Sequence, residues 1–510
     1  MRQLIIFFRA SSAIWQLTFI AIAVRLLAAV FSEGYFAHDD HFLVVEAAQS
    51  WADGYDYNNW LPWNQGAEAI PSGHSFFYVG LHFLLFELLN FLGLDDPKGR
   101  MLIVRLLHAL WSLVVVRAGY RIALRLSNAT TAWSAGLFLA LFCFMPFLSV
   151  RQLVEVACIP FLMLGGSKLL DLTSDRSRTA QLLIAFVAGI WLGFAINVRF
   201  QTLFFAAGPG LVLLLMNWRA AIAYGAGVLL PVLLVQGSID MLLWGRPFAE
   251  LTEYVRYNFE HATDYFDQPW YNYLILLAAI FIPPLSLAVF FGFFTSWRKH
   301  LPIWMAVFLF LAIHSYFPNK QERFILPIVP LFFVLGWCAW EQWRARSAFW
   351  TKRPAVWRGI LRWTWAINIP LLIGLSLSSG KRSRVEAMSM LREIQDVRGI
   401  VIEDSHEHEP PQAPLFYLGK WDATLLYVPD TLSDFRATLT KFGPAVRPNV
   451  VFFIGDEDLA YRVAWMERQT GELDLVGTAM PGLLDRTVHW LNPVNRNEAI
   501  AIYRLVDAGH

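Results

Sequence analysis

The stretch from Ser32 to Tyr78 decides how this chain can fold. It reads SEGYFAHDDHFLVVEAAQSWADGYDYNNWLPWNQGAEAIPSGHSFFY, and it contains no lysine or arginine. Long apolar segments lie directly before and after it. Its acidic residues are Glu33, Asp39, Asp40, Glu46, Asp53, Asp56 and Glu68. Because a loop needs no charge merely to connect two hydrophobic helices, these carboxylates indicate a functional surface.

The residues that follow Asp40 have roughly helical apolar spacing as far as Trp51. This pattern predicts a short helix lying along the membrane face. We expect Asp40 to stand at its start as a general base that faces water. Adjacent residues do not share a helix face, so we expect one of Asp39 and Asp40 to point into a cleft while the other caps the helix. A cap with a solvated charge is the alternative. A metal is not expected, because the sequence His38-Asp39-Asp40-His41 matches no zinc or calcium spacing.

The composition is that of a membrane protein. The 510 residues are 56% hydrophobic and 16% charged, with a mean hydropathy of +0.45, whereas a soluble domain carries about 25% charged residues. The net charge of +1 indicates no nucleic-acid partner. The 22 tryptophans and 41 phenylalanines suit aromatic belts at the bilayer interfaces. Cys143, Cys158 and Cys338 fall in apolar segments, which predicts core side chains and no disulfide frame.

Long apolar runs predict a polytopic α-helical protein with about 11 to 13 transmembrane helices, since each crossing needs about 20 mainly apolar residues. The candidate spans are 11–31, 75–94, 101–118, 130–148, 152–171, 181–198, 200–216, 221–243, 271–296, 302–317, 324–343 and 357–379. Arg9 interrupts the first apolar run and no small-residue cleavage pattern follows, so we expect a retained helix and no cleaved signal peptide.

Lysine and arginine orient these spans. The basic loops, expected in the cytoplasm, are 117–125, 168–178, the turn at Arg219, 297–300 and 344–358. The loops 32–74, 240–270 and 318–323 and the chain after Ser379 then face the other side. Two candidate spans lie between Tyr78 and Arg117. Because the loop before them is placed outside and the loop after them in the cytoplasm, this orientation requires an odd number of crossings here.

From Gly380 the chain has the pattern of a soluble domain. An amphipathic helix is expected over 383–398, with further helices over 433–441 and 457–470. Strands are expected over 400–402, 415–417, 425–428, 450–454 and 501–503. The predicted organisation is a transmembrane domain, 1–379, with its outer loop 32–74, and a small extracytoplasmic α/β domain, 380–510.

Basic residues at the predicted outer edge of the bilayer complement the acidic loop. Lys320 and Arg323 are three residues apart, so they share a face if a helix begins here. Paired cations suit a phosphate that stays near lipid, although snorkelling anchors would show the same pattern. Arg199 lies between two apolar spans and is a functional candidate by default. The alternative for Arg199, as for Arg25 and Arg151, is a structural pairing with a buried carboxylate such as Glu155.

The segment 239–270 mixes charged and aromatic residues, Arg246 among them. It could bind a sugar through hydrogen-bonding groups and aromatic faces, or be a folded surface loop.

In this order the motifs resemble the polyprenyl-phosphate-mannose-dependent mannosyltransferases of the GPI-anchor and N-glycan pathways, which have a multi-span GT-C fold. Their His-Pro-Asp-Glu signature is replaced here by His38-Asp39-Asp40-His41, so that Asp40 takes the place of the signature Asp. His41 stands in place of the signature Glu, so the role of a second acidic residue is unfilled at that position. Glu46 is the candidate to fill it. The similar stretches that follow are Ala69-Ile70-Pro71-Ser72, Ile239 to Phe248 with Tyr257-Asn258-Phe259 behind it, and Lys320-Gln321-Glu322-Arg323-Phe324.

The resemblance implies an inverting transfer of a sugar, mannose by analogy, from a polyprenyl-phosphate carrier, without a cofactor or a nucleotide-sugar site. The base would deprotonate an acceptor hydroxyl, and cations would hold the departing lipid phosphate. We expect Asp40 and Glu46 in catalysis. The expected substrate-binding residues are His38, Asp39, His41, Arg199, Arg246, Lys320, Glu322 and Arg323.

The expected partners are the lipid-linked donor, a glycan or glycolipid acceptor and membrane lipid. Short loops favour a bacterial inner membrane, with the endoplasmic reticulum membrane as the eukaryotic equivalent and the active site on the non-cytoplasmic face. A transporter or flippase of a lipid-linked anion is the alternative, although no repeated halves are present. A GT-C enzyme that transfers another sugar is a further one.

Overall fold

The structure, a computed structural model, describes residues 12–66, 69–264, 267–404, 411–428, 435–493 and 496–506. Glu68 of the acidic loop and the start of the predicted helix 433–441 lie outside these ranges. The chain forms two compact units. The first contains the described part of Met1–Val30 with Asn59–Leu81 and Ile103–Leu377, and the second contains Phe31–Asn58, His82–Leu102 and the described part of Ser378–His510.

This division differs from the predicted one in a way that bears on function. The second unit begins at Ser378, close to the predicted boundary, but it also includes the first half of the acidic loop, Phe31–Asn58.

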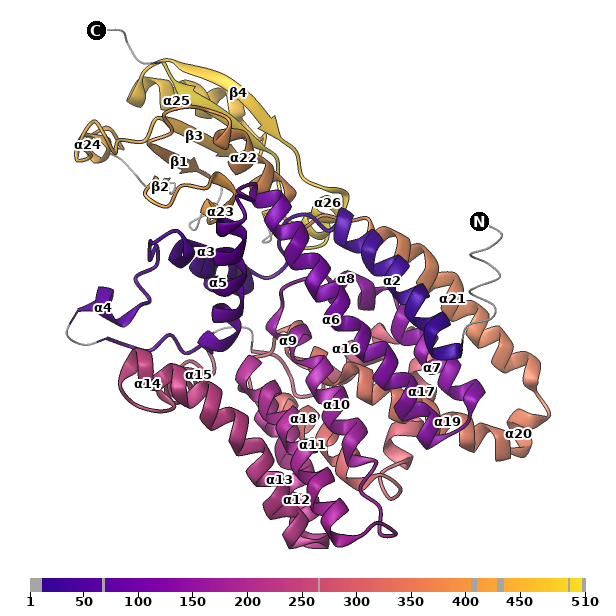
Figure 1. The fold of residues 1–510 in the computed structure, drawn as a ribbon. Helices are drawn as coiled ribbons and strands as arrows, with labels where there is room; N and C mark the ends of the chain where they lie inside the picture. Colours follow the sequence, from indigo (N-terminus) through magenta and orange to yellow (C-terminus); the bar gives the residue numbers. More distant parts are fainter. Residues whose placement is uncertain are drawn as a thin grey trace. The chain divides into compact units, whose positions relative to one another are not determined.

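The first unit is a packed group of helices, and its apolar segments follow the predicted spans (Figure 1). Their bounds are α2 (Ala13–Phe31), α4 (Pro62–Gln65), α5 (Phe76–Phe91), α6 (Pro97–Leu126), α7 (Ala129–Leu141), α8 (Phe144–Ser149), α9 (Val154–Ala157), α10 (Ile159–Leu169), α11 (Arg178–Val198), α12 (Thr202–Met216), α13 (Trp218–Pro231), η2 (Val232–Gly237), α14 (Ser238–Trp244), α15 (Ala249–Glu260), α16 (Asn272–Ile280), α17 (Leu285–Thr295), α18 (Leu301–Tyr316), η3 (Glu322–Ile328), α19 (Val329–Arg346), α20 (Ala348–Thr351) and α21 (Pro354–Ser376). α5 and α6 each have residues in both units.

Five described helical segments are long and apolar enough to cross a membrane by length and composition. They are Ala13–Phe31, Pro97–Leu126, Arg178–Val198, Trp218–Trp244 and Glu322–Arg346, and shorter apolar helices accompany them. Of the two predicted spans between Tyr78 and Arg117, α6 has 30 residues and α5 has 16. α5 alone would extend about 24 Å, short of a bilayer core of about 30 Å. Of these two helices, only α6 is long and apolar enough to cross a membrane by length and composition.

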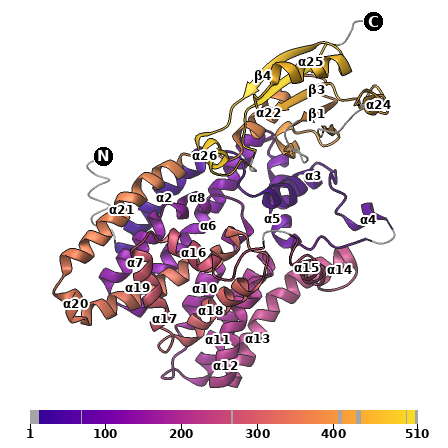
Figure 2. The ribbon, with the colours of Figure 1, turned by 180° about the vertical axis from the view of Figure 1, so that it is seen from behind.

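Helix α19 forms the centre of the first unit, because 83% of its most apolar window is buried. It packs against α7, α17 and α18, while α11 packs against α10 and α13 (Figure 2). α17 and α19 approach at glycines: a Cβ added to Gly292 would lie 1.9 Å from the Gly336 carbonyl oxygen. Small residues at such crossings allow the close backbone contact that drives helix association in membranes.

Prolines divide some of the predicted spans. Pro283 and Pro284 separate α16 from α17 within the predicted span 271–296, since proline has no N–H to continue a helical ladder. After Pro231 the helix α13 continues as the π-helical η2 and then α14. These breaks interrupt the backbone hydrogen bonds of the helices, but the segments on either side remain apolar as predicted.

The second unit contains a five-stranded sheet with the strand order β2-β1-β3-β5-β4. The strands are β1 (Gly399–Glu403), β2 (Thr424–Val428), β3 (Val450–Ile454), β4 (Leu473–Ala479) and β5 (Ile500–Leu505). β1 pairs in parallel with β2 and β3, and β5 pairs antiparallel with β3 and β4. Every residue of β1 and β3 is buried, as is typical of central strands covered on both faces.

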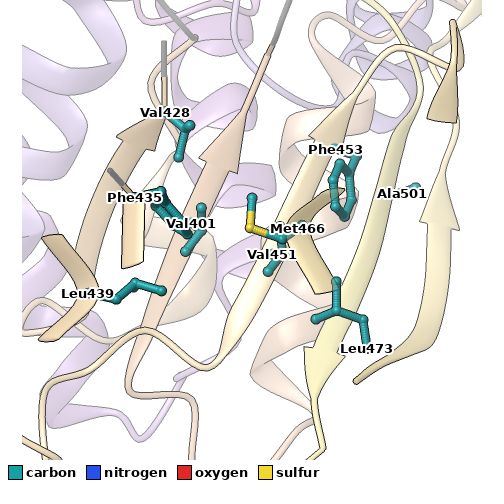
Figure 3. Close-up of a cluster of buried hydrophobic side chains, with 9 residues drawn as sticks. All are labelled: Val401, Val428, Phe435, Leu439, Val451, Phe453, Met466, Leu473 and Ala501. Carbon is teal, nitrogen blue, oxygen red and sulfur yellow. The ribbon is translucent and has the colours of Figure 1, made fainter. Parts of the chain in front are cut away.

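Helices cover both faces of this sheet. On one face, α24 (Phe435–Thr440) and α25 (Leu459–Thr470) pack on Val401, Val451 and Phe453, with Met466 of α25 between them (Figure 3). The alternate residues Ile402 and Phe452 point to the opposite face, where Arg384 of α22 (Arg382–Arg392) joins them around a small hollow. The remaining helices of this unit are η1 (Asp40–Glu46), α3 (Ala47–Ala52), α23 (Leu415–Leu418) and α26 (Leu483–Leu491).

The predicted α/β character is confirmed, with differences in particular elements. The predicted strand 415–417 is wrong: Leu415–Leu418 is the short helix α23, which Gly419 ends in the left-handed conformation. β4 was not predicted, because its middle residues are mostly exposed and it lacks a continuous apolar run. α22 ends at Arg392, before the predicted 398.

Candidate active site

Asp40 begins the helix η1, which continues into α3. The predicted helix after Asp40 is therefore confirmed, and its first part is of the rare π type, which is frequent at functional sites. Asp40 is only 3% exposed, so the expectation that it faces water is wrong. Asp39 occupies the N-cap position with helical backbone angles, and its side chain makes no capping hydrogen bond. The predicted cap is thus wrong, because the chain already has helical backbone angles at Asp39.

The two histidines beside these carboxylates have different surroundings. His38 is exposed, and its ring centroid lies 4.4 Å from that of Phe42. His41 is fully buried. Its ring stacks between Tyr35, at 4.4 Å between centroids, and Tyr417, at 5.7 Å. Of the two imidazoles, His38 is therefore the one open to a ligand, whereas His41 is part of a packed core.

Glu46, at the end of η1, is completely buried. Its Oε1 accepts a hydrogen bond of 3.0 Å from the backbone N–H of Phe416 and lies 3.3 Å from His41 Nε2. Burial raises the pKa of this carboxyl above its ordinary value. The oxygen that would act on a substrate is thus already engaged by the protein, which favours a positioning role for Glu46.

A group of charged side chains lies in the first unit around Glu155 of α9. Its Oε1 is 2.6 Å from Arg199 Nη1, at the end of α11, and 3.6 Å from Arg323 Nε in η3. The side chains are 1%, 9% and 13% exposed, respectively. Arg199 thus makes the carboxylate pairing that was its structural alternative. Two guanidinium groups therefore lie near one carboxylate.

The group around Glu155 has unused hydrogen-bonding capacity. Among the described residues, Glu155 Oε2 and Arg199 Nε are buried without a hydrogen-bond partner. A buried charged group without partners is costly. Arg199 Nε could donate to a polar or anionic ligand, whereas Glu155 Oε2 could only accept a hydrogen bond.

Gln201 and His314 belong to this group although the sequence did not identify them as site residues. Gln201 Oε1 accepts from Arg199 Nη2 and lies 3.3 Å from His314 Nε2. The guanidinium of Arg199 also lies over the Phe324 ring, 5.0 Å from its centroid. A histidine in the apolar segment 302–317 was the available signal for His314, because polar side chains in such segments are functional candidates.

Lys320 makes different contacts from those expected. Its ammonium donates to the backbone carbonyls of Gln268, at 2.8 Å, of Phe317 and of Pro318, and the residue is 3% exposed. An ammonium has three N–H donors, so these carbonyls use all of them. Burial lowers the pKa of Lys320. We therefore assign Lys320 to holding its own loop, and the phosphate-binding proposal rests on Arg199 and Arg323.

The remaining candidates are at the surface or structural. Arg246 and Glu322 are exposed, so the structure leaves both accessible to substrate. Arg25 is fully buried and donates to Ser112 and to backbone carbonyls of Ala21, Leu139 and Ala140. These bonds replace the expected carboxylate partner and give Arg25 a packing role. The three cysteines are free and buried, as expected.

A second buried polar group explains part of the segment 239–270. Gln236 Nε2 donates to Asp240, at 3.1 Å, and to Glu250, at 2.7 Å. Glu250 also accepts from the Phe76 backbone N–H at 2.9 Å and from Trp244 Nε1 at 3.2 Å. Both carboxyl groups are inaccessible to solvent, which favours a structural role at the junction of α14 and α15.

This group makes stability depend on pH. Burial, followed by the charge of Asp240, raises the pKa of Glu250 from 4.5 to about 8. Between these values the folded protein binds the proton that the unfolded chain has released, so the free energy of unfolding falls as pH rises through that window. We expect Glu250→Gln to remove up to about 1.4 kcal/mol per pH unit of this dependence. Thermal unfolding in detergent at pH 6 and pH 8 measures it.

The matched control is Glu253→Gln on the same helix, where Glu253 pairs with the more exposed Arg256 at 2.6 Å. It should keep the wild-type dependence. A Glu250→Gln protein that loses stability between pH 6 and pH 8 as steeply as the wild type would contradict the assignment.

Among the described residues, no group of three or more His, Cys, Asp or Glu side chains is arranged to hold a metal ion. Asp40 lies in the second unit, and the arginines around Glu155 lie in the first.

Known structures share this fold. ArnT from Cupriavidus metallidurans, bound to undecaprenyl phosphate, aligns with a TM-score of 0.63 at 13% identity, covering 98% of this chain and 100% of that one. An Archaeoglobus fulgidus oligosaccharyltransferase tethered with an acceptor peptide aligns with a TM-score of 0.50 at 12% identity, covering 90% and 71%. These alignments show that the chain shares the fold of these proteins, which is the predicted GT-C fold.

The sequence profile of the Alg9-like mannosyltransferase family matches residues 15–411. The chain therefore belongs to this family, a family of membrane glycosyltransferases, which confirms the resemblance and disfavours the transporter alternative. GPI alpha-1,2-mannosyltransferase 3 of Danio rerio is 24% identical over 372 residues, which cover 69% of this chain and 66% of that protein. Mannosyltransferase APTG1 of Arabidopsis thaliana is 25% identical over 409 residues, covering 72% and 69%.

Proposed function

We propose that this protein transfers mannose from a polyprenyl-phosphate carrier to a lipid-linked glycan or glycolipid. The reaction is a single displacement that inverts the configuration at the sugar C1, and it takes place at the non-cytoplasmic face of a bacterial inner membrane or of its eukaryotic equivalent. The observation that carries the proposal is the pair of arginines, Arg199 and Arg323, around the buried Glu155 in a chain of this family.

The arginine pair suits the leaving group of this reaction. A lipid phosphate departs as an anion, so it needs positive charge more than it needs a proton. Guanidinium groups bind phosphate through paired N–H donors and stay charged in a poorly hydrated place. A donor whose tail stays in the bilayer is consistent with ArnT, whose structure contains undecaprenyl phosphate.

Asp40 is the proposed base. The acceptor hydroxyl must lose a proton as its oxygen attacks C1, and a carboxylate within hydrogen-bonding reach removes it. Asp39 and His38, which precede η1, are the proposed contacts to the sugar, together with the exposed Arg246 and Glu322. Little competing water reaches the Asp40 carboxylate, because only 3% of the residue is exposed.

The biological test is mass spectrometry of lipid-linked glycans from cells that lack the protein. We expect an intermediate one hexose short of the wild-type product to accumulate, and the wild-type gene to restore the full glycan. An unchanged glycan profile, or accumulation of a complete glycan on one side of the membrane, would contradict a transferase.

A further inference from the structure

The C-terminal domain contacts the acidic loop through residues far apart in the sequence, all within the second unit. Gly34 pairs with Gly380 as an isolated β-bridge. The N–H of Tyr35 donates to Gly380 O at 3.3 Å, and the N–H of Gly380 donates to Glu33 O at 2.9 Å. A Cβ on Gly34, whose φ is +81°, would lie 1.8 Å from the Gly380 oxygen. The loop and the domain therefore join by direct backbone contact.

A second set of contacts is made on the helix that Asp40 begins. His41, the residue after Asp40, is held between Tyr35 and Tyr417 in parallel stacks, with 12° between the planes in each pair. One turn of chain later, Glu46 accepts the N–H of Phe416 at 3.0 Å. α23 thus contacts η1 near both of its ends, through a ring at the start and a backbone hydrogen bond at the end.

Further contacts fix the end of the loop. Trp421 Nε1 donates to Asp53 Oδ2 at 2.7 Å, just after α3. The Trp421 ring lies 5.6 Å from that of Tyr57 between centroids, and Tyr57 Oη donates to Phe42 O in η1 at 2.6 Å. Through Tyr57, the domain therefore also contacts η1 from the part of the loop that follows α3. The helix is thus fixed by residues both before and after it in the sequence.

From these contacts we propose that the C-terminal domain is part of the catalytic apparatus, with His41, Glu46 and Tyr417 as positioning residues that fix the helix presenting Asp40. This inference rests on the proposed role of Asp40. A misplacement of about 1 Å of a reacting group can reduce turnover by about 100-fold. Holding η1 therefore matters for kcat more than for binding of the lipid donor.

The test compares Tyr417→Ala with Tyr417→Phe in the full-length protein. Alanine removes the ring that covers His41, whereas phenylalanine keeps it. We expect Tyr417→Ala to lower kcat by about 100-fold with the donor KM unchanged, and Tyr417→Phe to stay within about threefold of wild type. Tyr461→Ala, on α25 where the residue is 69% exposed, is the matched control and should be unaffected.

Glu46 provides an independent comparison. Glutamine keeps the oxygen that accepts the Phe416 N–H, and burial already favours the neutral carboxyl. Glu46→Gln should thus retain activity, whereas Glu46→Ala should behave like Tyr417→Ala. An inactive but folded Glu46→Gln would mean that this carboxylate takes part in the chemistry, and it would overturn the positioning role.

Hydrogen–deuterium exchange separates this inference from the proposed function, because it needs no activity. In Tyr417→Ala the amides of 42–46 should exchange faster than in the wild type, while those of β3 keep their protection. Unchanged exchange at 42–46 would overturn the inference whether or not the protein transfers mannose. A wild type that transfers no mannose but shows the faster exchange in the variant would leave the positioning intact and refute the transfer.

Discussion

Asp40→Asn is expected to reduce mannose transfer by at least about 1,000-fold, since general base catalysis contributes 10²–10⁴-fold. The amide keeps the size and shape of the side chain but cannot accept the proton. Asp40 is 3% exposed, so an isosteric change is the least disruptive one available. The measurement is kcat and donor KM in liposomes that contain the purified protein, and the loss should appear in kcat alone.

Asp39→Asn is the matched control for this prediction, because it makes the same chemical change at the neighbouring position. Asp39 is partly exposed and is proposed to contact the sugar without taking the proton, so this variant should lose much less activity than Asp40→Asn. Equal losses in both variants, or a tenfold loss or less in Asp40→Asn, would contradict the assignment of the base.

Arg199→Ala is expected to weaken donor binding by at least about 100-fold, because a charge-assisted, buried phosphate contact is worth roughly 3 kcal/mol. Arg199→Lys should not restore it, since an ammonium lacks the paired donors of a guanidinium. The measurement is titration of the protein in detergent with polyprenyl phosphate. Arg219→Ala, at an exposed basic turn, is the control and should bind normally.

A double variant distinguishes lost binding from lost folding. Removing Arg199 alone leaves Glu155 without its partner at 2.6 Å, which destabilises a protein by about 3–5 kcal/mol. Arg199→Ala combined with Glu155→Ala removes the unpaired charge and should recover much of the stability. If the double variant also recovered donor binding, the arginine would not be a phosphate ligand.

Apolar pattern was sufficient for much of the fold. The predicted spans correspond to helical segments, and the strands at 400–402 and 450–454 lie at the centre of the sheet as β1 and β3. These segments are continuous apolar runs, so the sequence of each segment is enough to predict that it is buried. Leu415–Leu418 is too short for periodicity to separate helix from strand, and β4 is an edge strand with exposed residues.

The candidate site was predictable in residue type more than in contacts. Asp40 at a helix start and Arg199 beside Glu155 follow from charges placed next to apolar spans. Lys320 also fitted that pattern, yet its ammonium is used by nearby carbonyls. The contact of Glu46 with Phe416 joins residues 370 positions apart. Sequence spacing cannot predict this contact, because the contact depends on how the C-terminal domain packs.

The most direct test of the account is a single-turnover reaction of the reconstituted wild type, with polyprenyl-phosphate mannose as the donor and the glycan that accumulates without the protein as the acceptor. The anomeric configuration of the product is read by NMR. The account predicts transfer with inversion at C1, and no product from a nucleotide-activated mannose. Retention of configuration, or transfer from the nucleotide sugar alone, would contradict it.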